Sequence, residues 1–182
     1  FDVSHMGQLE LAGDDPAKAL ETLVPGDIKG LEDGATRYTQ LTDDNGGILD
    51  DLMVTRESER LLLVVNAASK AKDIAHIRAA MPNGYELLEL PDRALIALQG
   101  PHSATVLSDL GSAKFSTLPF MSMTVDAVCG IPCRVWRSGY TGEDGYEISC
   151  VDDDAEVLAR LLLAHKAVKP IGLGASDTLR LE

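Results

Sequence analysis

The sequence is poor in basic and aromatic residues. Lys and Arg together number 16 against 29 Asp and Glu, the formal net charge is −13 at pH 7, and Phe, Trp and Tyr make up only 4% of the chain. A nucleic-acid-binding surface needs clustered Lys and Arg to displace the counterions of the phosphate backbone. We therefore expect no nucleic-acid partner, and the acidic balance itself indicates a well-solvated surface.

Long hydrophobic runs are also missing. An apolar run such as Leu61–Val65 has five residues, whereas roughly 20 are needed to cross a bilayer. We therefore expect no membrane partner, and no basic and apolar signal pattern opens the chain. The first and last residues, Phe1 and Glu182, carry no helix-capping signal. For this reason we expect the sequence to be a fragment of a longer protein.

Cysteine is scarce, and no pair of cysteines has metal-site spacing. Cys129, Cys133 and Cys150 are an odd number with no CxxC motif. A disulfide across the turn between the first two is one option, but a reduced, cytoplasmic protein accounts better for the count. A zinc site needs about four N or S ligands at short paired spacings, and the four histidines are scattered at positions 5, 76, 102 and 165. We expect no metal.

The chain repeats one of its own patterns. A set of apolar residues and glycine recurs 87 positions later with the same residue types, as Leu9, Leu11, Gly13, Ala17, Leu20 and Leu23 and then as Ile96, Leu98, Gly100, Ala104, Leu107 and Leu110. Each copy predicts a half-buried strand, a turn at glycine and a helix with one apolar face. The period is longer than that of solenoid repeats. We interpret it as two similar α/β halves in one compact unit.

The remaining segments predict further strands and helices. Strands are expected at 37–42, 48–55, 60–65, 85–90, 123–128, 133–136 and 146–151, with helices at 68–80, at 152–165 and from 174 onward. An Asn-Gly turn joins the first two of these strands. The order of elements predicts an α+β fold with two ferredoxin-like lobes, residues 1–91 and 92–182.

Three stretches carry more polar residues than a core requires. In the strand that follows Gly46-Gly47, alternation places Asp50 and Asp51 on opposite faces, so that one carboxylate shares a face with apolar neighbours. A buried carboxylate is costly unless it is paired or used; an acid at the end of a hairpin is the plainer interpretation. The Gly-rich loop 138–147 lacks the Lys-Ser/Thr ending of a phosphate loop. His5 has no nucleophile partner that forms a triad with it.

Taken together, these stretches resemble the T-protein family of the glycine cleavage system. The matching motifs, in order and spacing, are FDVSHMGQ (1–8), GGILDDLMV (46–54), VVNA (64–67), ALQGP (97–101), SGYTGEDGYEIS (138–149) and the final DTLRLE. The resemblance covers the whole chain, 1–182. Members of the family extend further at both ends, so it implies that flanking segments and C-terminal domains are missing from this sequence.

The resemblance implies the folate-binding core of an aminomethyltransferase. In that reaction the aminomethyl carbon passes from the dihydrolipoyl arm of H-protein to tetrahydrofolate, and ammonia is released. It implies that Asp51 is the catalytic acid and that Glu147 holds the pteridine. The residues that it implies for the lining of the pocket are Met6, Tyr38, Asn66 and Tyr140. The expected compartment is the cytoplasm, or the mitochondrial matrix in a eukaryote.

One position departs from the family pattern. Where members carry a folate-contacting Arg, this chain has Ser176, which replaces a planar guanidinium by a neutral hydroxyl. Weaker folate binding, compensation by another cation and a divergent role are all compatible with this change. Weak binding by a fragment without its C-terminal domains is also compatible with the proposed activity.

Two alternatives remain at this stage. The chain can belong to the folate-binding portion of a sarcosine or dimethylglycine dehydrogenase, which carries a flavin domain upstream. It can also be a non-catalytic folate-binding module, although such relatives typically have a reactive Cys in the loop that corresponds to residues 139–142, and this chain has none there.

Overall fold

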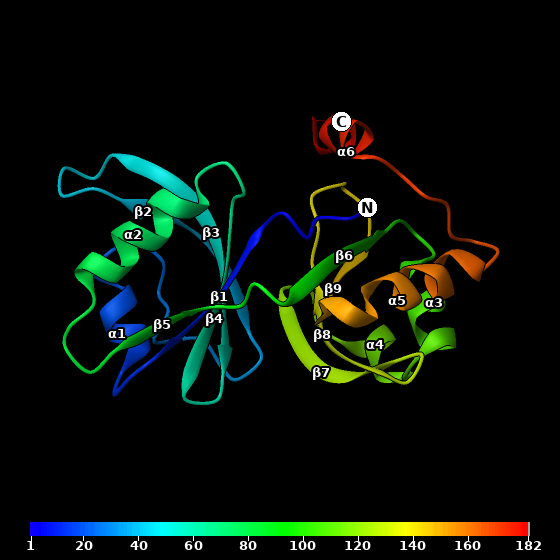
Figure 1. Cartoon of the computed structure of the whole chain (residues 1–182), viewed down its shortest axis with the longest axis horizontal. Helices are drawn as coiled ribbons and strands as arrows, with labels where there is room; N and C mark the ends of the chain where they lie inside the picture. Colours follow the sequence, from blue (N-terminus) through cyan, green and yellow to red (C-terminus); the bar gives the residue numbers. More distant parts are fainter. Residues whose placement is uncertain (182) are drawn as a thin grey trace. The chain divides into compact units, whose positions relative to one another are not determined.

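Two antiparallel sheets, each with helices packed against it, make up the computed structural model, which describes residues 1–181 (Figure 1). The chain divides into two compact units. The N-terminal unit is His5–Pro91; the C-terminal unit combines Phe1–Ser4 with the residues from Asp92 onward.

The N-terminal unit is a five-stranded sheet in the order β2-β3-β4-β1-β5, with every neighbouring pair antiparallel. Its elements are β1 (Gly7–Ala12), α1 (Pro16–Leu20), β2 (Thr36–Thr42), β3 (Ile48–Glu57), β4 (Arg60–Val65), α2 (Lys70–Ala80) and β5 (Glu86–Glu89). The predicted strands and helix of this half all form, with bounds that shift by at most two residues.

The core of this unit lies between the sheet and its two helices. Strand β4 is central, and Leu61, Leu63 and Val65 are at most 1% exposed. Helix α1 is short and depends on its cap: the Asp15 carboxylate accepts a hydrogen bond from the Lys18 N–H, and Pro16 occupies the first turn, where no N–H is needed. Helix α2 contributes Ile74 and Ile77 to the same core.

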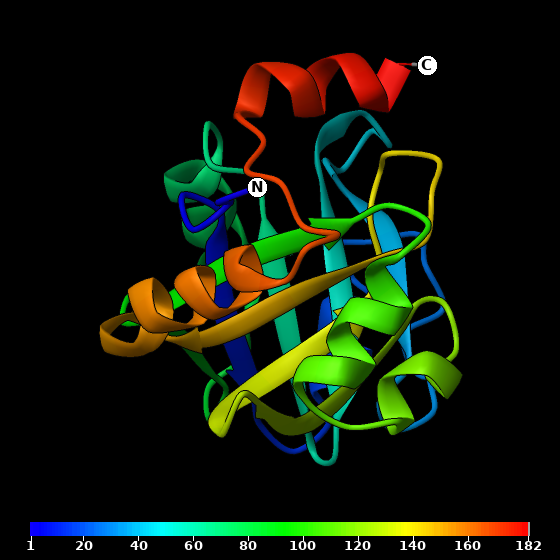
Figure 2. The same ribbon diagram turned by 90° about the vertical axis from the view of Figure 1, so that its right-hand side faces the viewer.

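The C-terminal unit is a four-stranded antiparallel sheet in the order β6-β9-β8-β7. Its elements are β6 (Arg93–Gln99), α3 (Ser103–Leu110), α4 (Lys114–Thr117), β7 (Ser122–Val128), β8 (Ile131–Arg137), β9 (Gly145–Val151), α5 (Asp152–Ala164) and α6 (Leu173–Leu181). Helices α3 and α5 pack on the sheet (Figure 2) around a core that includes Phe115 and Tyr146. The short α4 has no counterpart among the predicted elements, and α6 contains no buried side chain.

The two units share one topology, which matches the repeat in the sequence. Strand β1 and helix α1 correspond at an offset of 87 to β6 and α3. The strand orders β2-β3-β4-β1 and β7-β8-β9-β6 are equivalent. The predicted α+β class is confirmed. In detail, the first strand of each unit is separated from the second by two antiparallel strands, so the strand order differs from the interleaved βαβ pairs of a ferredoxin-like lobe.

The first four residues belong to the C-terminal unit, although the sequence suggested a lobe of residues 1–91. The Val3 N–H donates to the Leu95 carbonyl at 3.0 Å, and the Ala97 N–H donates to the Phe1 carbonyl at 2.9 Å. Phe1–Ser4 therefore lie along β6 as an added extended segment. Backbone hydrogen bonds of this kind leave no side-chain pattern, which is why sequence alone places the boundary elsewhere.

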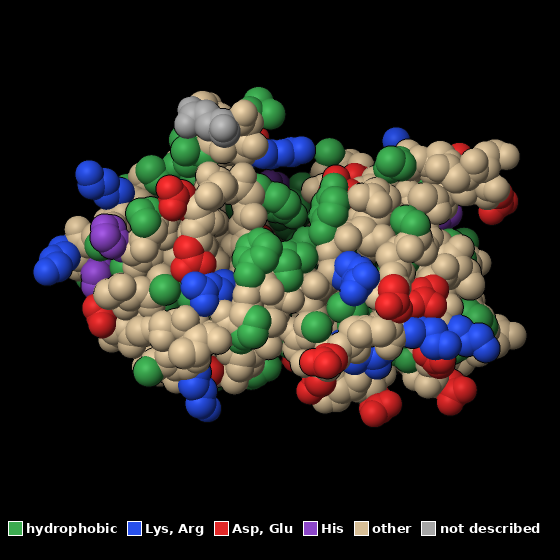
Figure 3. Space-filling model, turned by 180° about the vertical axis from the view of Figure 1, so that it is seen from behind, with side chains coloured by type: hydrophobic (Ala, Val, Ile, Leu, Met, Phe, Trp, Pro, Cys, Tyr) green, Lys and Arg blue, Asp and Glu red, His purple; other side chains and the backbone are tan. Residues whose placement is uncertain are grey.

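Charged side chains of both signs share the surface, and the three cysteines are unpaired thiols. Acidic and basic side chains are interspersed on the face shown in Figure 3. Cys129, Cys133 and Cys150 are all free, and burial raises the pKa of each thiol, that of Cys133 to about 11. Within residues 1–181, no helix is long and apolar enough to cross a bilayer.

Candidate functional site

Asp50 and Asp51 lie at the start of β3, on opposite faces of the sheet. Leu52 and Val54 continue the face of Asp50 and are 2% and 0% exposed, so Asp50 points to the side on which the core lies. Asp51 lies on the other face with Met53. The carboxylate that shares its face with the apolar core is therefore Asp50, whereas the family resemblance points to Asp51.

Asn66 connects the two carboxylates. It follows directly on β4, and β4 pairs with β3 from Leu52 onward, so its side chain reaches the preceding residues of β3. The Asn66 Nδ2 donates to Asp51 Oδ1 at 2.8 Å and to Asp50 Oδ1 at 2.9 Å. It also lies 3.2 Å from the Asp51 carbonyl. One amide thus fixes the orientation of both acids.

Tyr38 approaches Asp51 from β2. Gln40 is the direct cross-strand partner of Asp51, and Tyr38 lies two residues along the same face. Its hydroxyl donates to Asp51 Oδ2 at 3.0 Å, and the ring is 45% exposed. The structure therefore brings together three of the predicted site residues, Asp51, Tyr38 and Asn66. We call these three with Asp50 the Asp51 cluster.

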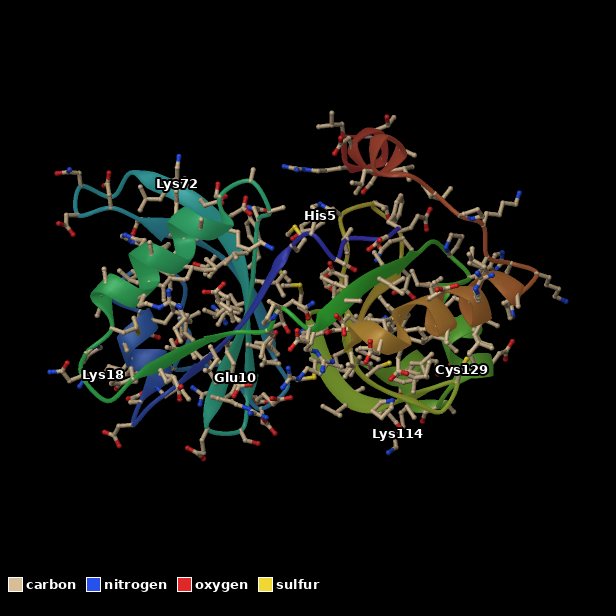
Figure 4. All side chains as sticks on the ribbon, in the orientation of Figure 1. His5, Glu10, Lys18, Lys72, Lys114 and Cys129 are labelled. Atoms are coloured by element: carbon tan, nitrogen blue, oxygen red, sulfur yellow. The ribbon has the colours of Figure 1, made fainter. Side chains whose placement is uncertain are left out.

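His5 lies on the segment that leads into β1 (Figure 4), and Met6 is the last residue before that strand. Gly7 pairs with Val65, so Met6 and Asn66 extend from neighbouring strand ends, one at the beginning of β1 and one after β4. Met6 is half-buried and His5 is exposed. Met6 is thus placed beside the Asp51 cluster by the register of the sheet.

A third acid, Asp73, belongs to the surroundings of this cluster and was not among the predicted site residues. It lies in the first turn of α2 and is 3% exposed. Burial raises the pKa of Asp73 to about 7, and a hydrogen bond with Asp50 and the charges of Asp50 and Asp51 act in the same direction. The sequence does indicate that Asp73 is buried, because it directly precedes Ile74 and lies four residues before Ile77, on the core-facing side of the predicted helix.

Glu147 lies on β9 in the C-terminal unit. It pairs with Ala97 on one side and with Trp136 on the other. The Ser138 hydroxyl donates a short hydrogen bond to Glu147 Oε2. Burial raises the pKa of Glu147, and this hydrogen bond opposes the rise only in part. A half-buried carboxylate that is oriented by one donor is suited to accept further donors from a ligand.

The loop that joins β8 to β9 is held by Gln99 at the end of β6. The Gln99 Nε2 donates to the Ser138 carbonyl at 3.0 Å and to the Tyr146 carbonyl at 3.2 Å. A Cβ atom at Gly139 or Gly145 would lie 1.9 Å or 2.0 Å from the Gln99 Oε1. The glycines therefore leave room for the amide that closes the loop.

A second anchor holds the same loop. Arg137 makes two hydrogen bonds to the Asp144 carboxylate, at 2.9 Å and 2.8 Å, in the paired geometry that guanidinium and carboxylate favour. Its remaining donors reach the carbonyls of Ser116 and Leu118. The pKa of Arg137 is raised by this pairing. Both ends of the loop are thus fixed.

Gly145→Ala tests the role of Gln99. The added methyl group displaces the Gln99 amide, and an unsatisfied buried polar group costs about 1–3 kcal/mol. We expect the free energy of unfolding, measured by urea denaturation, to fall by about that amount. In a Gln99→Ala background the collision is absent, so the same substitution should cost little. Equal losses in both backgrounds would contradict the mechanism.

The other two predicted site residues of this unit lie near the surface. Tyr140, in the loop, is 53% exposed. Ser176 lies on α6 and is partly exposed. A cavity of about 490 Å³ opens between β6, α3 and α5, with Ile96, Val106 and Leu162 among its lining residues. None of the predicted site residues lines it.

The comparison with known families gives one match over the whole chain. Residues 1–182 match the family model described as "GCVT N-terminal domain". The chain is 46% identical to the mitochondrial aminomethyltransferase of Homo sapiens over 189 residues, an alignment that covers 100% of this chain and 47% of the human protein. The chain spans about half the length of the curated relatives that it matches.

Solved structures agree with the sequence match. The aminomethyltransferase T of the glycine cleavage system from Bartonella henselae has a TM-score of 0.90 and 38% identity, covering 100% of this chain and 49% of that one. A heterotetrameric sarcosine oxidase from Corynebacterium has a TM-score of 0.61 at 19% identity, covering 98% of this chain and 83% of that one. At that identity the second likeness shows a shared fold alone.

Proposed function

Because the chain belongs to the GCVT N-terminal domain family, we propose that it forms the folate-binding and catalytic core of an aminomethyltransferase of the glycine cleavage system. The substrate is the aminomethyl group on the dihydrolipoyl arm of H-protein, and the acceptor is tetrahydrofolate. The products are methylenetetrahydrofolate, ammonia and the reduced arm.

The observation that carries this proposal is the geometry of the Asp51 cluster. Both oxygens of Asp51 accept a hydrogen bond, one from Asn66 and one from Tyr38. The carboxylate is therefore oriented before any ligand arrives, which is the condition for efficient proton transfer at a defined atom. Tyr38 is exposed at 45%, so a ligand can reach this side of the sheet.

In the proposed reaction Asp51 handles the proton that the departing amine requires. The aminomethyl carbon forms C–N bonds to two nitrogens of tetrahydrofolate, while its C–S bond to the arm and its C–N bond to the departing ammonia break. The two protons that the folate nitrogens lose end on the sulfur of the arm and on ammonia. The amine nitrogen departs as ammonia only when it has taken up a proton, so a positioned acid lowers the barrier. Exclusion of water matters as well, because hydrolysis of the aminomethyl group competes with transfer.

Glu147 is proposed to hold the pteridine. The edge of a pteridine presents adjacent N–H donors, and a carboxylate accepts two such donors in a paired arrangement. The half-buried Glu147 carboxyl group, with its pKa raised by desolvation and with Ser138 as a donor, supports this role. Tyr140 and Met6 are proposed to line the pocket, and no metal is part of the proposed chemistry.

The partner and compartment are also proposals. We propose lipoylated H-protein as the partner, since the carbon to be transferred resides on its arm. The human relative is named as mitochondrial, while relatives such as that of Anoxybacillus flavithermus are bacterial. These names support the mitochondrial matrix for a eukaryotic source and the cytoplasm for a bacterial one.

A reconstituted assay tests the function. The full-length protein, with lipoylated H-protein carrying the aminomethyl group and with tetrahydrofolate, is expected to release ammonia and form methylenetetrahydrofolate. Omitting tetrahydrofolate should leave only slow hydrolysis. Absence of folate-dependent ammonia release, with both substrates shown to be intact, would overturn the proposal.

Ser176→Arg tests whether this position limits folate affinity. A planar guanidinium offers paired donors to a carboxylate or a pteridine oxygen, and hydrogen bonds to charged groups contribute about 1.5–3 kcal/mol. We expect titration calorimetry with 5-formyltetrahydrofolate to show binding tightened by roughly tenfold. Ser176→Lys is the matched control, because it adds the charge without the planar fork and should give a smaller gain. Unchanged affinity in both variants would contradict the prediction.

A further inference from the structure

Asp73 lies in the first turn of α2, where a carboxylate is normally exposed to water, but its side chain is buried. Acids in the first turn of a helix usually stay exposed, where the helix dipole favours their charge. The neighbouring charged residue, Lys72, lies on the exposed side of α2 (Figure 4). Asp73 is 3% exposed and shares its helix face with Ile74 and Ile77. A buried carboxyl group needs either a partner or a proton.

The partner of Asp73 is Asp50. The two carboxyl groups lie within hydrogen-bonding reach of each other across α2 and β3. Within residues 1–181, however, the buried Oδ2 of each has no hydrogen-bond donor. Two ionised carboxylates only accept hydrogen bonds, so they would leave both oxygens unsatisfied and bring two like charges together. A single proton between them removes both costs.

The surroundings decide which of the two acids holds this proton. Burial would raise the pKa of Asp50, but hydrogen bonds from Asn66, from the Asp51 N–H, and from Ser69 and Asp73 lower it overall. The pKa of Asp73 is raised to about 7, by burial and then by Asp50 and Asp51 on β3, with Lys72 on its own helix opposing. Asp73 is therefore the protonated donor and Asp50 the ionised acceptor.

We propose that Asp73 is a positioning residue for the aminomethyl transfer: its proton holds Asp50, and Asp50 holds the Asn66 amide that orients Asp51. This inference rests on the proposed function, because Asp51 is a catalytic acid only within it. The links are the Asp73–Asp50 pair and the two hydrogen bonds from Asn66 Nδ2, at 2.9 Å to Asp50 and 2.8 Å to Asp51. Ionisation of Asp73 adds a third negative charge beside Asp50 and Asp51 and disturbs this arrangement.

Asp73→Asn keeps a hydrogen-bond donor at this position but removes the proton that titrates. The amide still donates to Asp50 but cannot lose a proton. In the full-length wild type, we expect the transfer rate to fall about tenfold from pH 6 to pH 8, as a group with a pKa of about 7 deprotonates. The variant should lack that fall, so that at pH 8 it is faster than the wild type. Asp73→Ala, which leaves Asp50 without a donor, should be slow at both pH values.

A second measurement does not depend on any activity. Because the folded-state pKa of Asp73 is raised from 3.8 to about 7, its contribution to stability is largest below the unfolded value and is lost as pH rises through that window. Urea unfolding of the chain should therefore show a decline from pH 4 to pH 7 that is smaller in Asp73→Asn. The matched control Asp44→Asn changes an exposed acid and should retain the decline.

The outcomes separate the inference from the proposed function. A decline that is unchanged in Asp73→Asn would overturn the proton pair. A reduced decline combined with a pH–rate profile identical to that of the wild type would overturn the positioning role. A wild type that performs no transfer at all would overturn the proposed function and the positioning role with it, while the unfolding data would still report the proton pair.

Discussion

Asp51→Asn is expected to lower the rate of aminomethyl transfer by about 100- to 10,000-fold, the range that a positioned acid or base contributes. Asparagine has nearly the same shape, so its carbonyl oxygen can accept from Asn66 and the Tyr38 hydroxyl can rotate to a new partner. Folding should survive. Single-turnover release of ammonia, measured with the full-length protein, H-protein and tetrahydrofolate, gives the rate directly.

The matched control for this prediction is Asp44→Asn. Asp44 lies in the hairpin that precedes β3 and is exposed, so its substitution makes the same change of charge away from the cluster. It should leave the rate unchanged. Folate affinity, measured in parallel, should be similar in both variants, because Asp51 is proposed to act on the proton rather than on binding. A full transfer rate in Asp51→Asn would remove the assignment.

Sequence periodicity predicted the elements well because most of them are decided by local patterns. Strand β4 was predicted with its observed bounds, since a run of apolar β-branched and Leu residues leaves little choice. The duplicated strand and helix were also recognisable, because their apolar positions repeat in register. The strand order was not available in this way: it depends on which edges pair, and side-chain patterns do not encode the partner of an edge.

The candidate site also combines features that local sequence patterns predict with contacts that only the fold creates. Alternation along β3 correctly indicated that one acid faces the core, but neither alternation nor resemblance identified Asp73 as the group beside it. That contact joins α2 to β3 over 23 positions of sequence, and only the fold brings the two together. The role of Gln99 was missed for the same reason, because its amide holds a loop 39 and more residues away.

Glu147→Gln is expected to weaken binding of 5-formyltetrahydrofolate by roughly 10- to 100-fold, since hydrogen bonds to a charged group contribute about 1.5–3 kcal/mol. A carboxylate accepts two pteridine N–H groups, whereas an amide presents one acceptor and one donor. The donor then opposes an N–H of the ligand. Titration calorimetry measures the change, and Glu143→Gln is the matched control, because Glu143 is an exposed acid of the same loop.

The pH dependence of binding gives a second, sharper test of Glu147. Burial raises the pKa of this carboxyl group above its ordinary value of 4.5, and only the ionised form accepts both donors. Folate affinity in the wild type should therefore rise as pH increases from the ordinary glutamate range through the raised pKa, and then level off. Glu147→Gln should show no such rise, while Ser138→Ala, which removes the donor that favours ionisation, should move it to higher pH. An affinity that rises equally with pH in Glu147→Gln would place the responsible group elsewhere.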